Sequence, residues 1–309
     1  VNYTILGTGG QINSAAGLTK VGTGSVTLNV PGNYSGNTVI SNGPISIGAN
    51  QTWANLSGNS AVDVSAGAPT ITVNNSLNTT FAGSLNGALG LTKSGVGQFT
   101  LPGSNSFTGN LFVKAGGVTL SSGFLGLASF ASIGQNGTDD GTLTVKGTTV
   151  VAANNDFNVG DVGTSIGTLN VQDTASLTVS SFYIGSANAA ASTASGTVNQ
   201  TGGAVTQLNT GAGTFCIGGR VETTSVGGVG VYNLSGGTLT AAAGIRVGSA
   251  GPGTFNQSGG IVNAGGDINI GRFAASSGTY NLDGGTLRAA HVLSSIGPNA
   301  ILNLNGGVL

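Results

Sequence analysis

One short pattern recurs seven times in the second half of the chain, and it restricts the possible folds more than any other feature of the sequence. Each copy starts at a small anchor residue and continues with alternating polar and apolar residues. The copies start at residues 141, 167, 196, 230, 253, 278 and 300 and read GTLTV, GTLNV, GTVNQ, GVYNL, GTFNQ, GTYNL and AILNL. Repeats of this length with variable insertions predict a solenoid, in which each unit is one coil and contacts only its neighbours.

Each unit contains three stretches with the period of two that β-strands require. The first follows the anchor, and the second places an apolar residue nine positions after it, at Val205, Leu239, Val262, Leu287 and Leu309. The third has apolar residues on both sides of a variable one and ends at glycine, at 157–160, 182–185, 215–218, 245–248 and 268–271. We expect the flanking apolar side chains to point inward together and the variable middle residue to point out.

Three short strands joined by glycine-rich corners predict an all-β fold, a parallel β-helix with three strands per coil. The chain has 58 glycines in 309 residues. Glycine at the corners allows positive φ and close stacking of coils. The Gly, Ser, Thr and Asn content and the missing 3.6-residue period argue against helix.

The first half repeats at a longer distance. GLTKVGTGSVTL (17–28) returns as GLTKSGVGQFTL (90–101), and the similarity continues at the same offset of 73 residues. We interpret 73 residues as about three coils of about 24 residues, which gives about 12 coils for the whole chain. The sequence then divides into a cap or coil-completing segment (1–16), a β-helix with the 73-residue repeat (17–140) and a continuous β-helix with the Gly/Asn repeat (141–309).

The block G-L-T-K-x-G-x-G, followed by T-L and by an aromatic residue before Ser/Thr-Gly-Asn, resembles the autotransporter-associated β-strand repeat of bacterial passenger domains. Its two copies cover residues 17–47 and 90–120. The resemblance implies a right-handed parallel β-helix displayed outside the cell, with a role in adhesion, in aggregation or as a stalk. No amphipathic translocator barrel accompanies it, so the secretion route is open.

Charge and hydrophobicity limit the partners of the chain. It has eight Lys and Arg against nine Asp and Glu, a net charge of −1, so it has no basic surface for nucleic acid or anionic lipid. It has no apolar run of about 18 residues and no signal-peptide pattern. With no methionine and one cysteine, we interpret it as a mature or excised segment of an exported protein, extracellular or on the bacterial cell surface.

One polar position recurs in the first strand of the units. It holds asparagine in six of the seven units, at Asn170, Asn199, Asn233, Asn256, Asn281 and Asn303. Stacked coils would place these amides in a hydrogen-bonded ladder. The alternative is that each asparagine satisfies only its own turn.

The ionisable residues do not form a recognisable catalytic or metal-binding set. We interpret Asp139, Asp140, Asp156, Asp161 and Asp173 as solvated turn residues, and His291 as a surface histidine. Arg246, Arg272 and Arg288 fall at non-equivalent positions of their units and are expected in solvated positions, with ligand contact as the alternative. The calcium nonapeptide pattern is present only in fragments, so the sequence predicts no cofactor, no metal site and no catalytic residue.

Three further residues are of types that can form sites. Cys216 is expected to be an inert, half-exposed thiol, with an intermolecular disulfide as the alternative. Tyr183 is expected on the surface, where it could stack on sugar, and Trp53 is expected to be an inner or capping residue. The abundant outward Ser and Thr are compatible with attached glycans.

The sequence therefore predicts a non-enzymatic structural rod, either a fibre subunit or the stalk or adhesive passenger of a surface protein. The last unit stops at Leu309, short of the length of its predecessors, and an uncovered β-helix end invites added strands. We therefore expect self-association by head-to-tail stacking, and contact with host or matrix glycans is a further expectation. The alternative is a β-helix that binds or cleaves polysaccharide, with its site in the insertions near 186–195 or 219–229.

Overall fold

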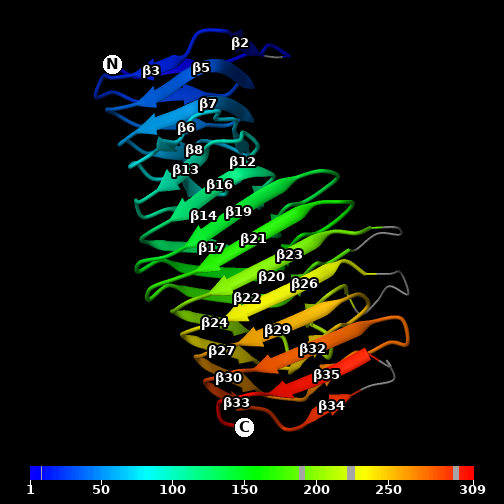
Figure 1. Cartoon of the computed structure of the whole chain (residues 1–309). Coiled ribbons are helices and arrows are strands. Elements are labelled where there is room, and N and C mark those ends of the chain that lie inside the picture. The colour runs from blue at the N-terminus through cyan, green and yellow to red at the C-terminus, as the bar shows by residue number, and fades with distance from the viewer. Residues whose placement is uncertain (8, 188–191, 221–226, 295–298) are drawn as a thin grey trace.

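The chain winds into a long β-solenoid with its termini at opposite ends (Figure 1). A computed structural model describes residues 1–7, 9–187, 192–220, 227–294 and 299–309. All regular structure in these residues is β-strand, and every strand pairing is parallel. The expected all-β parallel β-helix is confirmed.

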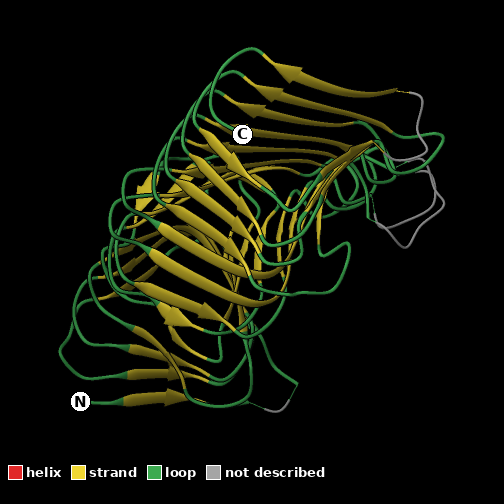
Figure 2. Cartoon of the chain, turned by 90° about the horizontal axis from the view of Figure 1, so that it is seen from below, coloured by secondary structure: helices red, strands yellow, loops and turns green. Residues whose placement is uncertain are grey.

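Three stacks of parallel strands form the sides of the solenoid, and Figure 2 shows the loops gathered where the coils turn. The first stack continues down the molecule as a sheet of ten strands. Its members are β10 (Thr79–Thr80), β13 (Gln98–Leu101), β16 (Ala115–Leu120), β19 (Asp140–Val145), β21 (Ile166–Val171), β23 (Ser195–Gln200), β26 (Val229–Leu234), β29 (Gly253–Gln257), β32 (Ser277–Leu282) and β35 (Asn299–Leu304). Above it, β3 (Leu18–Lys20) pairs with the second half of β5 (Gly32–Ile40) and leads into β7 (Gln51–Gly58).

The second stack lies beside the first. Its upper part is β1 (Tyr3–Ile5), β4 (Val26–Leu28), β6 (Ile45–Ile47), β8 (Val62–Val64), β11 (Asn86–Gly87) and β14 (Ser106–Phe107). Its lower part is β17 (Phe124–Leu127), β20 (Val150–Val159), β22 (Ser176–Ile184), β24 (Ala204–Gln207), β27 (Thr238–Ala241), β30 (Ile261–Ala264) and β33 (Thr286–Arg288).

The third stack closes each coil. It contains β2 (Ile12–Ser14), β9 (Thr70–Val73), β12 (Gly90–Lys93), β15 (Leu111–Val113), β18 (Ala131–Ile133), β25 (Phe215–Ile217), β28 (Ile245–Val247), β31 (Ile268–Ile270) and β34 (Val292–Ser294). The long strands β5, β7, β20 and β22 each serve two stacks, because they continue through a corner.

The apolar residues of successive coils lie above one another. Val205 pairs with Leu239, Leu239 with Val262, and Val262 with Leu287, and all four side chains are buried. At about 25 cal/mol per Å² of buried apolar surface, such a column supplies most of the stabilisation of the fold. The alternation read from the sequence therefore correctly identifies the core side of these strands.

The 73-residue repeat does not match a whole number of coils. Lys20 pairs with Ile40, Ile40 with Gly58 and Gly58 with Phe81, so three coils take 61 residues. The next coil adds 20 more. Lys93, which is 73 residues after Lys20, therefore lies between the third and fourth coils, on the third stack instead of the first. The prediction that the repeat spans three coils of about 24 residues was wrong, because the coils in this half are shorter.

The N-terminal segment takes part in the solenoid. β1 pairs in parallel with β4, and β2 with β5. Residues 1–16 thus supply strands of the first coil.

Candidate functional site

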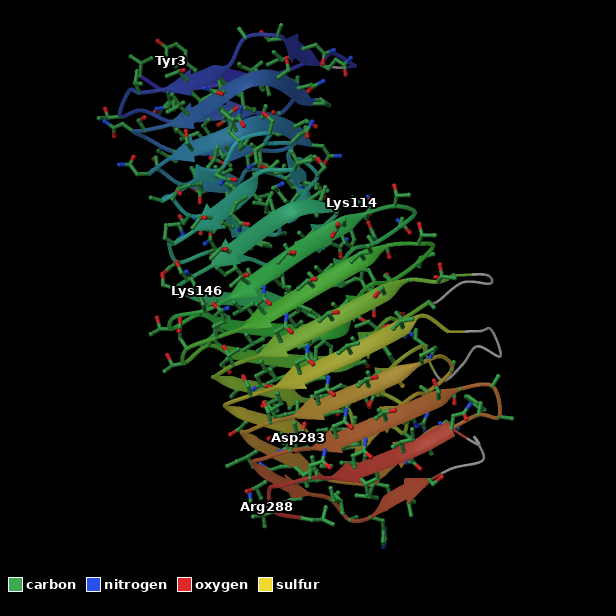
Figure 3. The ribbon with its side chains drawn as sticks, in the orientation of Figure 1. Tyr3, Lys114, Lys146, Asp283 and Arg288 are labelled. Carbon is green, nitrogen blue, oxygen red and sulfur yellow. The ribbon has the colours of Figure 1, made fainter. Side chains whose placement is uncertain are left out.

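Charged side chains are few, and several of them lie apart on the outer surface. Lys114, Lys146, Asp283 and Arg288 occupy different levels of the solenoid (Figure 3). Sites must therefore be sought where stacking brings together residues that are distant in sequence.

The six recurrent asparagines form one continuous column on the outer face of the first stack. Each side-chain Nδ2 donates to the Oδ1 of the preceding unit, at 3.0, 2.9, 2.8, 2.7 and 2.7 Å from Asn199 to Asn303. The column begins with Asn170 Nδ2, which donates to Thr144 Oγ1 at 3.3 Å. Such a ladder links each coil to the next in one register.

Stacking also creates a polar seam outside the core, along the end of the third stack. We call it the outer seam. One wall carries the middle residues of the third-stack strands, and the other carries the residues just after the corner glycine. Its members are Ser132, Asn158, Tyr183, Cys216, Arg246 and Asn269 on the first wall, and Asp161, Ser186, Ser249 and Arg272 on the second.

The corner glycines explain why the two walls converge. Gly160, Gly185, Gly218, Gly248 and Gly271 have φ between 64 and 80°, a conformation that side chains other than glycine rarely adopt. A Cβ at Gly185 would lie 2.2 Å from the carbonyl oxygen of Val229. The chain therefore bends so that residues three apart, such as Asn158 and Asp161, face the same space.

Burial in the outer seam corrects several expectations. The middle residues do point away from the core, but Asn158 is 1% exposed, Tyr183 6% and Cys216 0%. The expected surface tyrosine and half-exposed thiol were therefore wrong, since the bend covers the outward side of the strand. Trp53, by contrast, is fully buried in the core as expected.

Asp161 is a buried carboxyl group and not a solvated turn residue. It is 5% exposed, and Ser132 Oγ donates to its Oδ2 at 3.4 Å. Burial raises the pKa of Asp161, while Asn158, Ser186, Arg220 and Ser132 act in the opposite direction. A group of this kind is available as a proton donor at a higher pH than an ordinary aspartate.

Arg220 ties the upper part of the seam together. Its Nη2 lies 2.6 Å from Asp156 Oδ2, and its guanidinium carbon lies 3.8 Å from the centre of the Tyr183 ring. Burial opposes the charge of Arg220, but the hydrogen bond and charge of Asp156 outweigh it and raise the pKa of Arg220. Asp156 was expected to be solvated, and the ion pair instead joins two coils across 64 residues of sequence.

Buried polar atoms without a hydrogen-bond partner gather in the outer seam. Among the described residues they include both amide atoms of Asn158 and one atom each of Asp161, Ser186, Arg246, Ser249 and Arg272. Native interiors leave few such groups. Atoms of this kind can bind a polar ligand or water, and about half of those in the described chain lie in the seam.

The remaining candidates lie on the surface. His291 Nδ1 is 2.8 Å from Asp267 Oδ1, and its side chain is 70% exposed, so the surface histidine has an acidic neighbour that the sequence did not reveal. Asp139 caps the backbone N–H of Asn136, and Asp173 accepts from that of Gly147. Arg288 donates to Asn263 at the surface.

Asp139 and Asp140 also border a polar hollow of about 770 Å³. Gly116 and Gly117, which have no side chains, and Lys114 also line it. No group of three or more metal-ligating side chains was found in the described parts of the chain.

Two lysines of the repeat have a role that the sequence reading missed. Lys20 Nζ donates to the carbonyl oxygens of Gly22 and Asn42, and Lys93 Nζ to those of Gly95 and Ala115. Lys93 is fully buried in the column of core residues that includes Val73 and Val113. The lysine of the G-L-T-K pattern thus joins its own corner to the next coil. Its presence in both copies of the repeat was the feature of the sequence that could have indicated this role.

The insertions proposed as alternative sites are only partly described. Residues 188–191 and 221–226 lie outside the described residues. A search of the described residues for helices able to cross a membrane found none.

Comparison with known proteins identifies the repeat of the first half. Residues 18–46 and 91–123 match the model of the passenger-associated-transport-repeat, which confirms the resemblance for these two stretches. They cover 29 and 33 of the 309 residues. No curated protein and no solved structure gave a significant match.

Proposed function

We propose that this chain is a non-catalytic β-solenoid segment of an autotransporter-type passenger, secreted or displayed on the cell surface as a stalk or rod. The main observation is that two passenger repeats, separated by residues 47–90, fall on coils of the same parallel solenoid. A continuous core with polar ladders suits a rod, because its stability comes from nearest-neighbour contacts and grows with each coil.

Surface display tests the proposal. The chain, with an epitope inserted at the exposed 136–139 turn, is fused to a translocator barrel and expressed in bacteria. We expect the epitope to be accessible to antibody and to external protease on intact cells. Epitope found only in the cell interior, with a control passenger displayed normally, would contradict the proposal.

A second proposal concerns the ends of the rod. The last coil exposes apolar side chains, with Ile301 at 48% and Leu304 at 57%, and the first exposes Tyr3 at 62%. We propose that these edges are covered by another β-helical coil, which belongs either to a second copy of the chain or to a further coil of the same protein. Light scattering that shows a monomer at all concentrations, together with microscopy free of filaments, would argue against stacking between copies.

The alternative function is polysaccharide binding or cleavage. Its specific support is the outer seam, where Arg220 lies over the Tyr183 ring, pairs with Asp156 and acts on the buried Asp161 carboxyl. A reducing-end assay against acidic and neutral polysaccharides tests cleavage. Product release that Asp161→Asn abolishes would favour the enzyme over the rod.

A further inference from the structure

The lower end of the outer seam carries two arginines on adjacent coils. Arg246 lies in the middle of β28, and Arg272 follows β31 after Gly271. β28 and β31 are paired in register, with Arg246 opposite Asn269. The N–H of Arg272 donates to the carbonyl oxygen of Gly248 at 2.9 Å, so Arg272 lies about one strand spacing, roughly 4.8 Å, from Ser249.

The corner glycine brings Ser249 into the same space as Arg246. Gly248 has φ 75° and separates the two residues as Gly160 separates Asn158 from Asp161. In that upper part of the seam the two walls do meet, because Ser132 Oγ on the first wall donates to Asp161 Oδ2 on the second at 3.4 Å. From the same backbone turn at Gly248 we infer that Arg246 and Ser249 face the same space, with Arg272 one coil below.

These three side chains have unused hydrogen-bonding atoms. Arg246 Nη1, Arg272 Nη1 and Ser249 Oγ are buried and have no hydrogen-bond partner, and Ser249 is fully buried. Neither arginine forms an ion pair with any described acidic residue. Arg272 has one aromatic neighbour, the Phe273 ring, 5.1 Å from its guanidinium carbon.

Charge indicates the type of ligand. Two partly buried guanidinium groups without counter-ions are costly, and a planar guanidinium pairs best with an oxyanion. Asp267 lines a cavity of about 140 Å³ together with Arg246, but its Oδ1 lies 2.8 Å from His291 Nδ1. The hydroxyl of Ser249 adds a neutral donor beside the two cations.

We propose that Arg246, Ser249 and Arg272 form a binding site for a small oxyanion. Its source is either the carboxylate or sulfate group of an acidic glycan or a free inorganic anion. The site does not depend on the proposed role as a rod, because it follows from these two coils alone.

Calorimetric titration of the whole chain tests the site, with sodium sulfate at constant ionic strength as the first probe. We expect saturable binding with one site per chain, weakened at least about tenfold in Arg246→Met, Arg272→Met. The matched control is Arg288→Met, since Arg288 is a surface arginine on the next coil, and it should bind like the wild type. Absence of saturable binding, or equal binding by the double variant, would overturn the proposal.

Further arms identify the source of the anion and guard against misfolding. A uronic acid oligomer that binds more tightly than sulfate, while a neutral oligosaccharide of equal length does not bind, assigns the site to acidic glycan. Binding of sulfate without the oligomer assigns it to a free anion. If the double variant fails to fold, the single variants Ser249→Ala and Arg246→Lys replace it. Sulfate affinity unchanged in both single variants would reject the site.

Discussion

The two halves of the solenoid build the same core with different polar devices. In the upper half, buried side chains at strand ends donate to corner carbonyls, as Lys20, Gln51, Asn75 and Lys93 do. In the lower half, Gln200 and Gln257 take this part.

The outer column of the first stack differs in the same way. Its upper part is a run of threonines, and its lower part is the asparagine ladder; in register the threonines are Thr80, Thr100, Thr119 and Thr144. The alternation that places apolar side chains inward therefore defines the fold in both halves. The polar groups at the corners can be satisfied by any side chain that is long enough to reach a corner carbonyl. Variants at comparable positions of the two halves test this interpretation.

The largest effect is expected in the aromatic core of the lower half. Phe255 is stacked between Tyr232 and Tyr280, with ring centroids 4.9 and 4.7 Å apart. Phe255→Ala should lower the free energy of unfolding by about 3–5 kcal/mol. Phe99→Leu in the upper half should cost less than Phe255→Leu by about 0.5–1.5 kcal/mol, since Phe99 lacks the stack. Equal losses in denaturant titrations would show that stacking contributes nothing.

The next effect concerns the buried lysine of the upper half. Lys93→Met keeps the apolar stem but leaves the carbonyls of Gly95 and Ala115 without this donor, and should cost about 1–3 kcal/mol at pH 7.

The same lysine gives a pH signature. Burial lowers the pKa of Lys93 from 10.5 to about 8. Between these values the unfolded chain binds more protons than the folded one, so stability should rise with pH across this window and stay level below it. Lys93→Met should lose this rise in unfolding titrations made from pH 7 to 10.5. A slope identical to that of the wild type would show that Lys93 is not its cause.

A smaller effect is expected at the buried tyrosines. Tyr280 Oη donates to Gln257 Oε1 at 2.6 Å, and burial raises the pKa of Tyr280. Tyr280→Phe should cost about 1–2 kcal/mol, because it leaves the glutamine oxygen unpartnered. Adding Gln257→Leu should recover part of the loss, because it removes the unpartnered oxygen together with the donor to the Thr286 carbonyl, and the preceding coil has Leu234 at this position. A double variant no better than Tyr280→Phe would contradict this pairing.

The smallest effect is expected on the outer face. Asn233→Ala removes a half-buried amide and two ladder bonds, and should cost about 1 kcal/mol. Asn233→Thr should cost less, because Thr144 already occupies this place at the head of the column. Thr100→Ala in the upper half should be nearly neutral. A loss for Thr100→Ala as large as that for Asn233→Ala would show that the amides have no special role.

The alternation of polar and apolar residues was enough to predict which face of the repeat strands points inward. Period-two alternation identified the inward residues such as Val262 and Leu287, because packing against the next coil requires apolar side chains there whatever the rest of the unit contains. Aligning the repeats on their anchor residues also put the asparagines at one position of the unit. Residues at the same position form a column when the coils stack.

What covers the outward faces, and which residues of different coils meet, is known only from the folded chain. Alternation shows that Tyr183, Cys216 and Asn158 point away from the core. It does not show that the chain bends over them at a corner glycine with positive φ. Likewise, the meeting of Asp156 with Arg220 and of Asp267 with His291 depends on coil lengths. These lengths are the sum of corner and loop conformations, which local sequence patterns do not fix.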